Sequence, residues 1–163
     1  MNIFYLDSDP IKAAQIQYNK HVVKMVLESA QMLCTAHHHY AELLDYKPDY
    51  VPYKKAHYNH PSTIWCRQNV KQYYWLYNHM IALGEEYTKR YGKEHLTITK
   101  CKDILEYPPF GIPLTADFTE PPQAMPDEYK VEGDSLTAYW NYYEQEKYKI
   151  KGKNEKKIIR TFN

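Results

Sequence analysis

Apolar residues recur at helical spacing over two long stretches of the chain. The first runs from Pro10 to about Glu42, with a break near Asn19, and the second runs from Pro61 to Gly92. The apolar stripe of the first stretch, expected to be buried, consists of Val22, Val23, Val26, Leu27, Ala30, Leu33 and Cys34. That of the second consists of Ile64, Trp65, Tyr73, Leu76, Met80 and Leu83. The pattern predicts two long helices that pack through these faces.

Capping residues set the expected helix ends. Asp9 before Pro10 is typical of a helix start, and Asn59 is the expected cap of the helix that Pro61 opens. Gly92 is the kind of residue that follows a helix terminus. A short helix is predicted over Thr99–Glu106, and Asp134 with Ser135 is expected to cap a last helix over about 136–148.

The remaining segments predict irregular structure. Residues 2–6 are β-prone and fit a strand or an extended arm, 46–61 form a loop rich in Tyr, His and Pro, and 107–133 are rich in proline. The prediction is an all-α fold, a compact bundle of two long helices plus shorter helices, with a short N-terminal arm and a Pro-rich irregular C-terminal segment. One domain is expected over 1–163, with a basic tail, 149–163, that can be flexible.

Charge and cysteine content narrow the classes of partner. The net charge of +1 gives no overall basic field, so any contact with nucleic acid must come from a local patch. The Lys-rich tail, with Lys153, Lys156 and Lys157, is the candidate to follow a phosphate backbone, although charged termini are often merely solvated. Three widely spaced cysteines favour reduced thiols in a cytoplasm over a disulfide framework. No apolar run is long enough to predict a membrane span or a signal peptide.

One polar stripe on the first long helix carries candidate chemistry. It consists of His21, Lys24, Glu28, Gln31 and Thr35, which fall within about 80° of one another at 100° per residue. A carboxylate beside an amine and an imidazole can hold or transfer protons. The alternative is a solvated helix face with an ordinary ion pair between Lys24 and Glu28.

A second candidate cluster, His57-Tyr-Asn-His60-Pro61, precedes the second long helix. A histidine at a helix N-terminus can act as a neutral donor, and an anion can bind the free N–H groups there. The alternative is a capping turn in which Asn59 and His60 satisfy the helix start. His37-His38-His39 does not predict a metal site, because consecutive helical residues point 100° apart. No metal and no other cofactor is expected.

Two of these motifs resemble the phage endonuclease V type pyrimidine-dimer DNA glycosylases. Asn19-Lys-His21 followed by Glu28 resembles the first helix of that family, and Asn59-His60-Pro61 is similar to an Asn-His-Pro element of its bacterial members. The order of arm, Glu-bearing helix, His-bearing loop and second long helix is also similar. The whole chain looks like phage-borne proteins that contain Tyr-Leu-Asp-x-Asp-Pro and Lys-His-Val-Val-Lys-Met.

The resemblance implies an all-helical, metal-free DNA glycosylase with abasic-site lyase activity. It implies that Glu28 stabilises the sugar cation and takes a proton in the lyase step, with His21 beside it. The implied nucleophile is an amine, for which the candidates are the α-amine of Met1 or Asn2 and the side chain of Lys24. Gln31, Asn59, His60 and the three tail lysines are the expected substrate-binding residues.

The expected partner is DNA or a nucleotide, and a modified base is as acceptable a substrate as a pyrimidine dimer. Two other classes of function remain open. The chain can be a non-catalytic phage protein that binds a host or defence protein through loop 46–61, because aromatic loops make good binding hot spots. It can also be a metal-dependent nucleotide or phosphoester hydrolase that uses its His and Asp residues.

Overall fold

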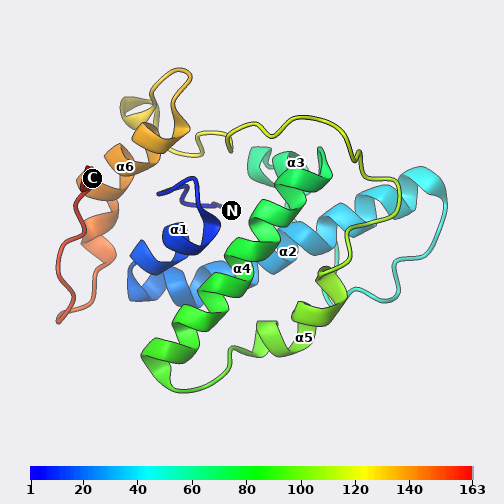
Figure 1. Ribbon diagram of the computed structural model, residues 1–163, viewed down its shortest axis with the longest axis horizontal. Helices are drawn as coiled ribbons and strands as arrows, with labels where there is room; N and C mark the ends of the chain where they lie inside the picture. The colour runs from blue at the N-terminus through cyan, green and yellow to red at the C-terminus, as the bar shows by residue number, and fades with distance from the viewer. Residues whose placement is uncertain (163) are drawn as a thin grey trace.

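Two long helices, α2 (Asn19–Leu44) and α4 (Val70–Tyr91), cross at the centre of the molecule (Figure 1). The structure, a computed structural model, describes residues 1–162. The shorter α-helices are α1 (Pro10–Ile16), α3 (Pro61–Cys66), α5 (Leu96–Leu105) and α6 (Ser135–Gln145), and the 3-10 helices are η1 (Asp127–Tyr129) and η2 (Lys147–Ile150). There is no strand within residues 1–162. The predicted all-α bundle is therefore confirmed.

The predicted helix starts at Asp9 and Asp134 are confirmed by their hydrogen bonds. The Asp9 carboxylate accepts the Ile11 N–H at 2.9 Å, and that of Asp134 accepts the Thr137 N–H at 3.0 Å. The expected break near Asn19 is also confirmed, because α1 ends at Ile16 and α2 begins at Asn19. These caps satisfy N–H groups that have no partner within the helix.

The prediction of one unbroken helix from Pro61 to Gly92 is wrong. The chain leaves helical geometry between α3 and α4, and Asn69 has an extended backbone (φ −162°, ψ 168°) and caps α4 by accepting the Gln72 N–H at 3.0 Å. The predicted cap of α3 is also wrong, because Nδ1 of His60, not Asn59, accepts the Ser62 N–H at 3.1 Å. The predicted end at Gly92 is confirmed, where φ is +73°.

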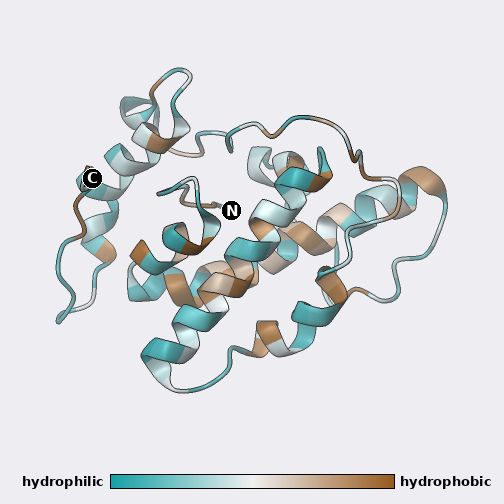
Figure 2. Cartoon of the chain, viewed as in Figure 1, coloured by the Kyte–Doolittle hydropathy of each residue, from teal (hydrophilic) through white to brown (hydrophobic). Residues whose placement is uncertain are grey.

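The core lies between α2 and α4, and most of the predicted apolar stripe is buried in it. Val23 and Leu27 are the exceptions: each is 39% exposed, so the prediction that they are buried is wrong. Each follows a fully buried valine by one position, and one residue turns a helix by 100°. That step carries both side chains out of the core to the side of α2 that bears Lys24. Figure 2 shows apolar and polar residues alternating around these helices.

Other helix ends differ modestly from the prediction. The helix predicted over Thr99–Glu106 is α5, which begins earlier, at Leu96, where the His95 side chain supplies the cap. The last helix, α6, ends at Gln145, and the 3-10 helix η2 follows it and ends at Ile150. Residues 2–6 form an arm without strand pairing, in which Phe4 has the unusual φ of 54°.

The proline-rich segment 107–133 wraps the helices instead of packing as a layer of its own (Figure 1). The Val70 N–H donates to Pro113 O at 2.9 Å, and the Trp65 indole N–H donates to Thr119 O at 2.9 Å. Further along, Ala124 O accepts from the Asn2 side chain at 2.9 Å. The segment thus follows α3 and α4 and then reaches the N-terminal arm.

The basic tail packs against the start of α2 through its backbone and one acid. The Ile158 N–H donates to the Tyr18 hydroxyl at 2.9 Å, and Glu155 Oε2 accepts the Asn19 N–H at 3.0 Å. Asn163, the last residue of the predicted tail, lies outside the described residues. Among the helices of residues 1–162, none combines the length and the apolar character that a membrane crossing requires.

Candidate active site

A carboxylate lies between two amines on the exposed side of α2. Glu28 Oε1 is 3.5 Å from the α-amine of Met1, and Glu28 Oε2 is 3.7 Å from Nζ of Lys24. The Met1 side chain is 1% exposed and that of Glu28 is 13% exposed, whereas Lys24 is 71% exposed. The α-amine therefore belongs to an anchored residue, while the Lys24 amine is on a side chain free to move in solvent.

These groups line an open pocket of about 370 Å³. Its lining residues are Met1, Lys24, Leu27, Glu28, Gln31 and His57. Three members of the predicted polar stripe thus share one cavity with the N-terminus. A volume of this size is in the range of small-ligand sites. The pocket is formed by α2, the arm and loop 46–61.

The arm holds Met1 in place through Asn2 and the apolar residues that follow it. Asn2 Oδ1 accepts the N–H groups of Ile3 at 2.7 Å and Phe4 at 3.0 Å, and its Nδ2 donates to Ala124 O. Residues 3–6 are all buried. The Asn2 side chain therefore shapes the arm and does not line the pocket. The role of Asn2 as a source of the amine stays a prediction.

His21 packs against the arm and does not line the pocket. Its ring stacks on Phe4 with 4.0 Å between centroids, and its Nδ1 lies 2.9 Å from the Tyr143 hydroxyl. Burial lowers the pKa of His21 to about 3, and the positive charges of Lys147 and Lys24 act in the same direction. The imidazole is therefore neutral at physiological pH and serves as a packing surface for the arm.

Thr35, the far end of the polar stripe, fixes the loop that carries His57. Its hydroxyl donates to Ala56 O at 3.1 Å and accepts the Ala56 N–H at 3.0 Å. The next residue, His57, has φ of 48° and reaches the pocket. A non-glycine residue in this left-handed region is held there by its surroundings. The sequence pointed to the cluster around His57 but not to its place beside Glu28.

His60 caps α3 and is close to the pocket without lining it. Because Nδ1 accepts the Ser62 N–H, that nitrogen is unprotonated and Nε2 carries the ring hydrogen. Burial lowers the pKa of His60, the Met1 ammonium and His57 lower it further, and Glu28 opposes the shift. His60 is thus a neutral donor in the electric field of the Met1–Glu28 pair. Asn59 is exposed on the loop.

Sequence reasoning missed Leu27, which was expected in the core and instead lines the pocket. Its spacing from the polar residues of α2 could have predicted this position. Leu27 lies three residues after Lys24 and four before Gln31, so helical spacing puts it on their face. The three tail lysines do not line this pocket; Lys157 lines a separate groove, and Lys153 and Lys156 are exposed.

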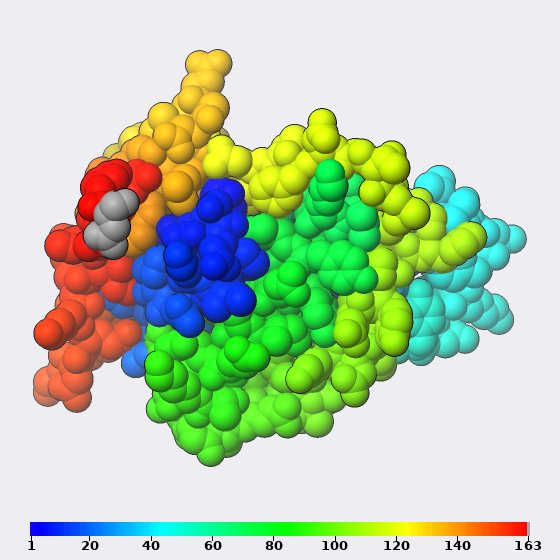
Figure 3. All heavy atoms as spheres, in the orientation of Figure 1, coloured from blue at the N-terminus to red at the C-terminus, as the bar shows by residue number. Residues whose placement is uncertain are grey.

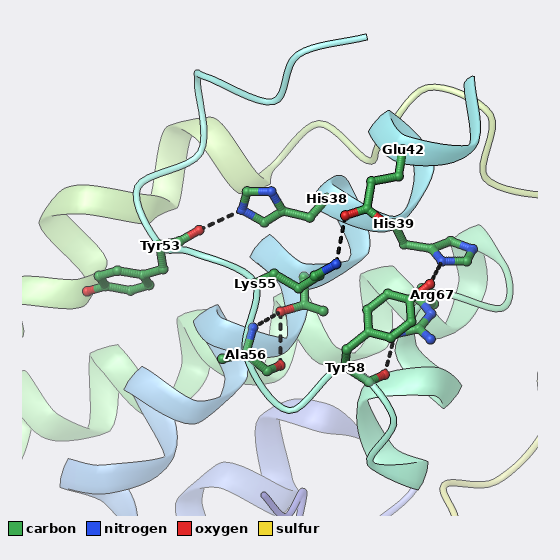
Figure 4. A network of polar contacts seen from close by, with 9 residues as sticks. His38, His39, Glu42, Tyr53, Lys55, Ala56, Tyr58 and Arg67 are labelled. Atoms are coloured by element: carbon green, nitrogen blue, oxygen red, sulfur yellow. Dashed lines mark hydrogen bonds and ion pairs between the residues drawn. The ribbon is translucent and has the colours of Figure 1, made fainter. Parts of the chain in front are cut away.

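The Tyr- and His-rich loop is tied to α2 by a network of polar contacts (Figure 4). His38 Nε2 is 2.9 Å from Tyr53 O, and His39 Nδ1 is 2.6 Å from the Tyr58 hydroxyl. The Arg67 guanidinium covers the Tyr58 ring at 4.0 Å. Much of the aromatic surface that a binding loop would offer is thus used in contacts within the chain.

The described residues contain no group of three or more His, Cys, Asp or Glu side chains arranged to hold a metal ion. His37 instead lies between two tyrosine hydroxyls, each 2.9 Å from a ring nitrogen.

In comparisons with protein families, curated proteins and solved structures, this chain matched none of them.

Proposed function

We propose that this chain is a DNA glycosylase with abasic-site lyase activity, which cleaves a nucleobase–sugar bond through an amine beside Glu28. The observation that supports the proposal most is the 3.5 Å separation between the Met1 α-amine and Glu28 Oε1 at the edge of an open pocket. An imine-forming reaction needs an amine, a nearby base and room for a sugar, and these three are present together.

The proposed reaction begins with proton loss from the amine, for which Glu28 is the adjacent acceptor. The amine adds to C1′ of the sugar. The base leaves with the electron pair of the C1′–N bond and takes up the proton that Glu28 had accepted, which returns Glu28 to its carboxylate form. The nitrogen then loses one proton, its lone pair displaces O4′ from C1′, and O4′ takes up a proton, which gives a ring-opened protonated imine. The carboxylate form of Glu28 stabilises the positive charge that develops at C1′.

In the lyase step, Glu28 takes a proton from C2′ of the imine. The electrons form a C2′–C3′ double bond, and the phosphate on C3′ leaves with the electron pair of the C3′–O bond. Water then hydrolyses the imine and releases the amine unchanged. His57 and Gln31, which line the same pocket, are placed to hydrogen-bond the sugar or the departing base.

Two amines are candidates for the nucleophile. The Met1 α-amine is closer to Glu28 and is anchored by its buried side chain, and Lys24 is the alternative. The first assignment requires Met1 to be the first residue of the mature protein, which an intact-mass measurement checks.

The test of the proposal is cleavage of DNA that contains an abasic site. Wild-type protein should cleave it, and Glu28→Gln should reduce cleavage to background. Glu42→Gln is the matched control, since Glu42 lies on the same helix but forms its ion pair with Lys55 at an exposed site. Absence of cleavage by the folded wild-type protein, or equal cleavage by Glu28→Gln, overturns the proposal.

A further inference from the structure

A second and larger cavity, of about 830 Å³, lies between α1, α6 and the C-terminal tail. We call it the tail groove; the residues that matter here are Asp7, Lys12, Trp140, Lys157, Arg160 and Phe162. Figure 3 shows the N-terminal residues, in blue, beside the tail, in red. None of its lining residues lines the pocket of Glu28.

Positive charge is concentrated in the tail groove. Lys12 comes from α1, and Lys157 and Arg160 come from the tail, so separate parts of the chain contribute cations. Asp7 is the carboxylate among the lining residues, and its Oδ1 accepts the Asp9 N–H at 2.8 Å. In a chain whose net charge is only +1, this local excess favours an anionic partner.

The groove also offers one exposed aromatic ring for stacking, that of Phe162. Phe162 is 79% exposed, and the Arg160 guanidinium lies 4.5 Å from the centre of its ring. Trp140 forms part of the wall and is fixed by its indole N–H, which donates to Leu6 O at 2.8 Å. Stacking surfaces beside cations are typical of sites that bind single-stranded nucleic acid, because every base has a π-face.

The tail groove and the Glu28 pocket are joined by the arm. Met1 lines the pocket and Asp7 lines the groove, and six extended residues span at most about 20 Å. The arm is shorter than that limit, because Phe4 has a positive φ and the Leu6 N–H turns back to Phe4 O. Met1 of the pocket and Asp7 of the groove are therefore less than about 20 Å apart.

We propose that the tail groove binds single-stranded nucleic acid next to the site of chemistry. Lys12, Lys157 and Arg160 contact phosphates, and a base stacks at Phe162. The choice of nucleic acid as partner rests on the proposed function. Single strands are favoured over duplexes because the exposed ring of Phe162 can receive an unstacked base, whereas the bases of a duplex are stacked inside the helix.

The test measures binding of a fluorescein-labelled, undamaged thymidine 12-mer by anisotropy over a range of salt concentrations. The triple variant Lys12→Gln, Lys157→Gln and Arg160→Gln should bind at least about 10-fold more weakly than wild type. Removing three phosphate contacts should also lower the slope of log K against log salt by about 2. The single variant Lys12→Gln, which keeps the bond from Arg160 to Thr137, should lose part of this affinity.

The matched control is Lys47→Gln, Lys93→Gln and Lys100→Gln, which removes the same charge at exposed positions outside the groove. Equal weakening by both triple variants, tighter binding of the duplex 12-mer, or equal binding of polyglutamate overturns the inference. Groove-dependent binding without cleavage of abasic DNA would refute only the enzyme assignment, and cleavage without groove-dependent binding would refute only the groove.

Discussion

The ring of Phe4 lies on the imidazole of His21, with 4.0 Å between centroids and 18° between planes. Through this contact α2 holds the arm and, with it, Met1, whose amine lies beside Glu28. The histidine of the polar stripe therefore acts on the candidate site indirectly, as a positioning residue, while Glu28 lies at the site itself.

Variants of the two stacked residues should show whether His21 only positions the arm or takes part in the reaction. Phe4→Ala should destabilise the fold by about 3 kcal/mol through the lost packing. It should also lower cleavage of abasic DNA by on the order of 100-fold, because small displacements of a reacting group are costly. His21→Phe keeps a stacking ring and should retain most of the activity with an unchanged pH profile. Loss of activity in a stably folded His21→Phe variant would instead place the imidazole in the reaction.

The hydroxyl of Thr35 should be required to place His57. Thr35→Val leaves both backbone groups of Ala56 without this partner, so we expect a loss of about 1–3 kcal/mol in unfolding free energy. Cleavage should fall as well, because the neighbouring His57 is released. Thr35→Ser retains the hydroxyl and should restore both quantities. If Thr35→Val lowers stability but leaves cleavage unchanged, His57 does not contribute to the reaction.

Three buried histidines should make the protein sensitive to mild acid. Burial is the largest cause that lowers the pKa of His21 to about 3 and those of His37 and His79 to about 4. The unfolded chain binds these protons near pH 6.5, so stability is full above that value and falls as the pH drops toward the folded-state pKa values.

For three such groups the loss approaches about 4 kcal/mol per pH unit below pH 6. Urea denaturation at pH 7, 6 and 5 measures it. His79→Gln should flatten this dependence by roughly one third. A stability that is constant from pH 7 to 5 would contradict the assignment of these histidines as neutral.

The close packing of α5 on α4 should require a residue without a side chain at Gly84. A Cβ at this position would lie 2.5 Å from Cγ1 of Ile98, which is too close for a real contact. Gly84→Ala should therefore destabilise the protein by about 1–3 kcal/mol. Ile98→Val removes Cδ1, one of the two atoms within 2.6 Å, and the double variant should recover part of the loss. Additive losses in thermal unfolding would show that the two positions do not interact.

The sequence predicted which residues share a face of α2, because helical spacing alone decides that question. It could not predict what covers the face. The Glu28 pocket exists because the arm and loop 46–61 reach α2 from other parts of the chain, and Asn2, Phe4 and Thr35 make the contacts that hold them. Those contacts are tertiary and leave no periodic signal.

The break before α4 was missed for a related reason. Apolar spacing continues from Trp65 to Tyr73 across the interruption, and neither glycine nor proline marks it. The chain leaves helical geometry at Asn69 because the Asn69 side chain makes two other bonds. Its Oδ1 accepts the Gln72 N–H, which caps α4, and its Nδ2 donates to Asp117 O at 3.2 Å. The second partner lies in the proline-rich segment, far away in sequence.

Borohydride trapping on DNA with an abasic site tests the central claim most directly. Reduction of the imine would leave a covalent protein–DNA adduct, and mass mapping would locate the attached amine. We predict an adduct at the α-amine of Met1 with wild-type protein and with Lys24→Gln, and loss of that adduct when residues are added before Met1. An adduct at Lys24 would instead identify the Lys24 side-chain amine, which lies 3.7 Å from Glu28 Oε2, as the nucleophile. No adduct from folded, DNA-binding wild-type protein would contradict the imine mechanism.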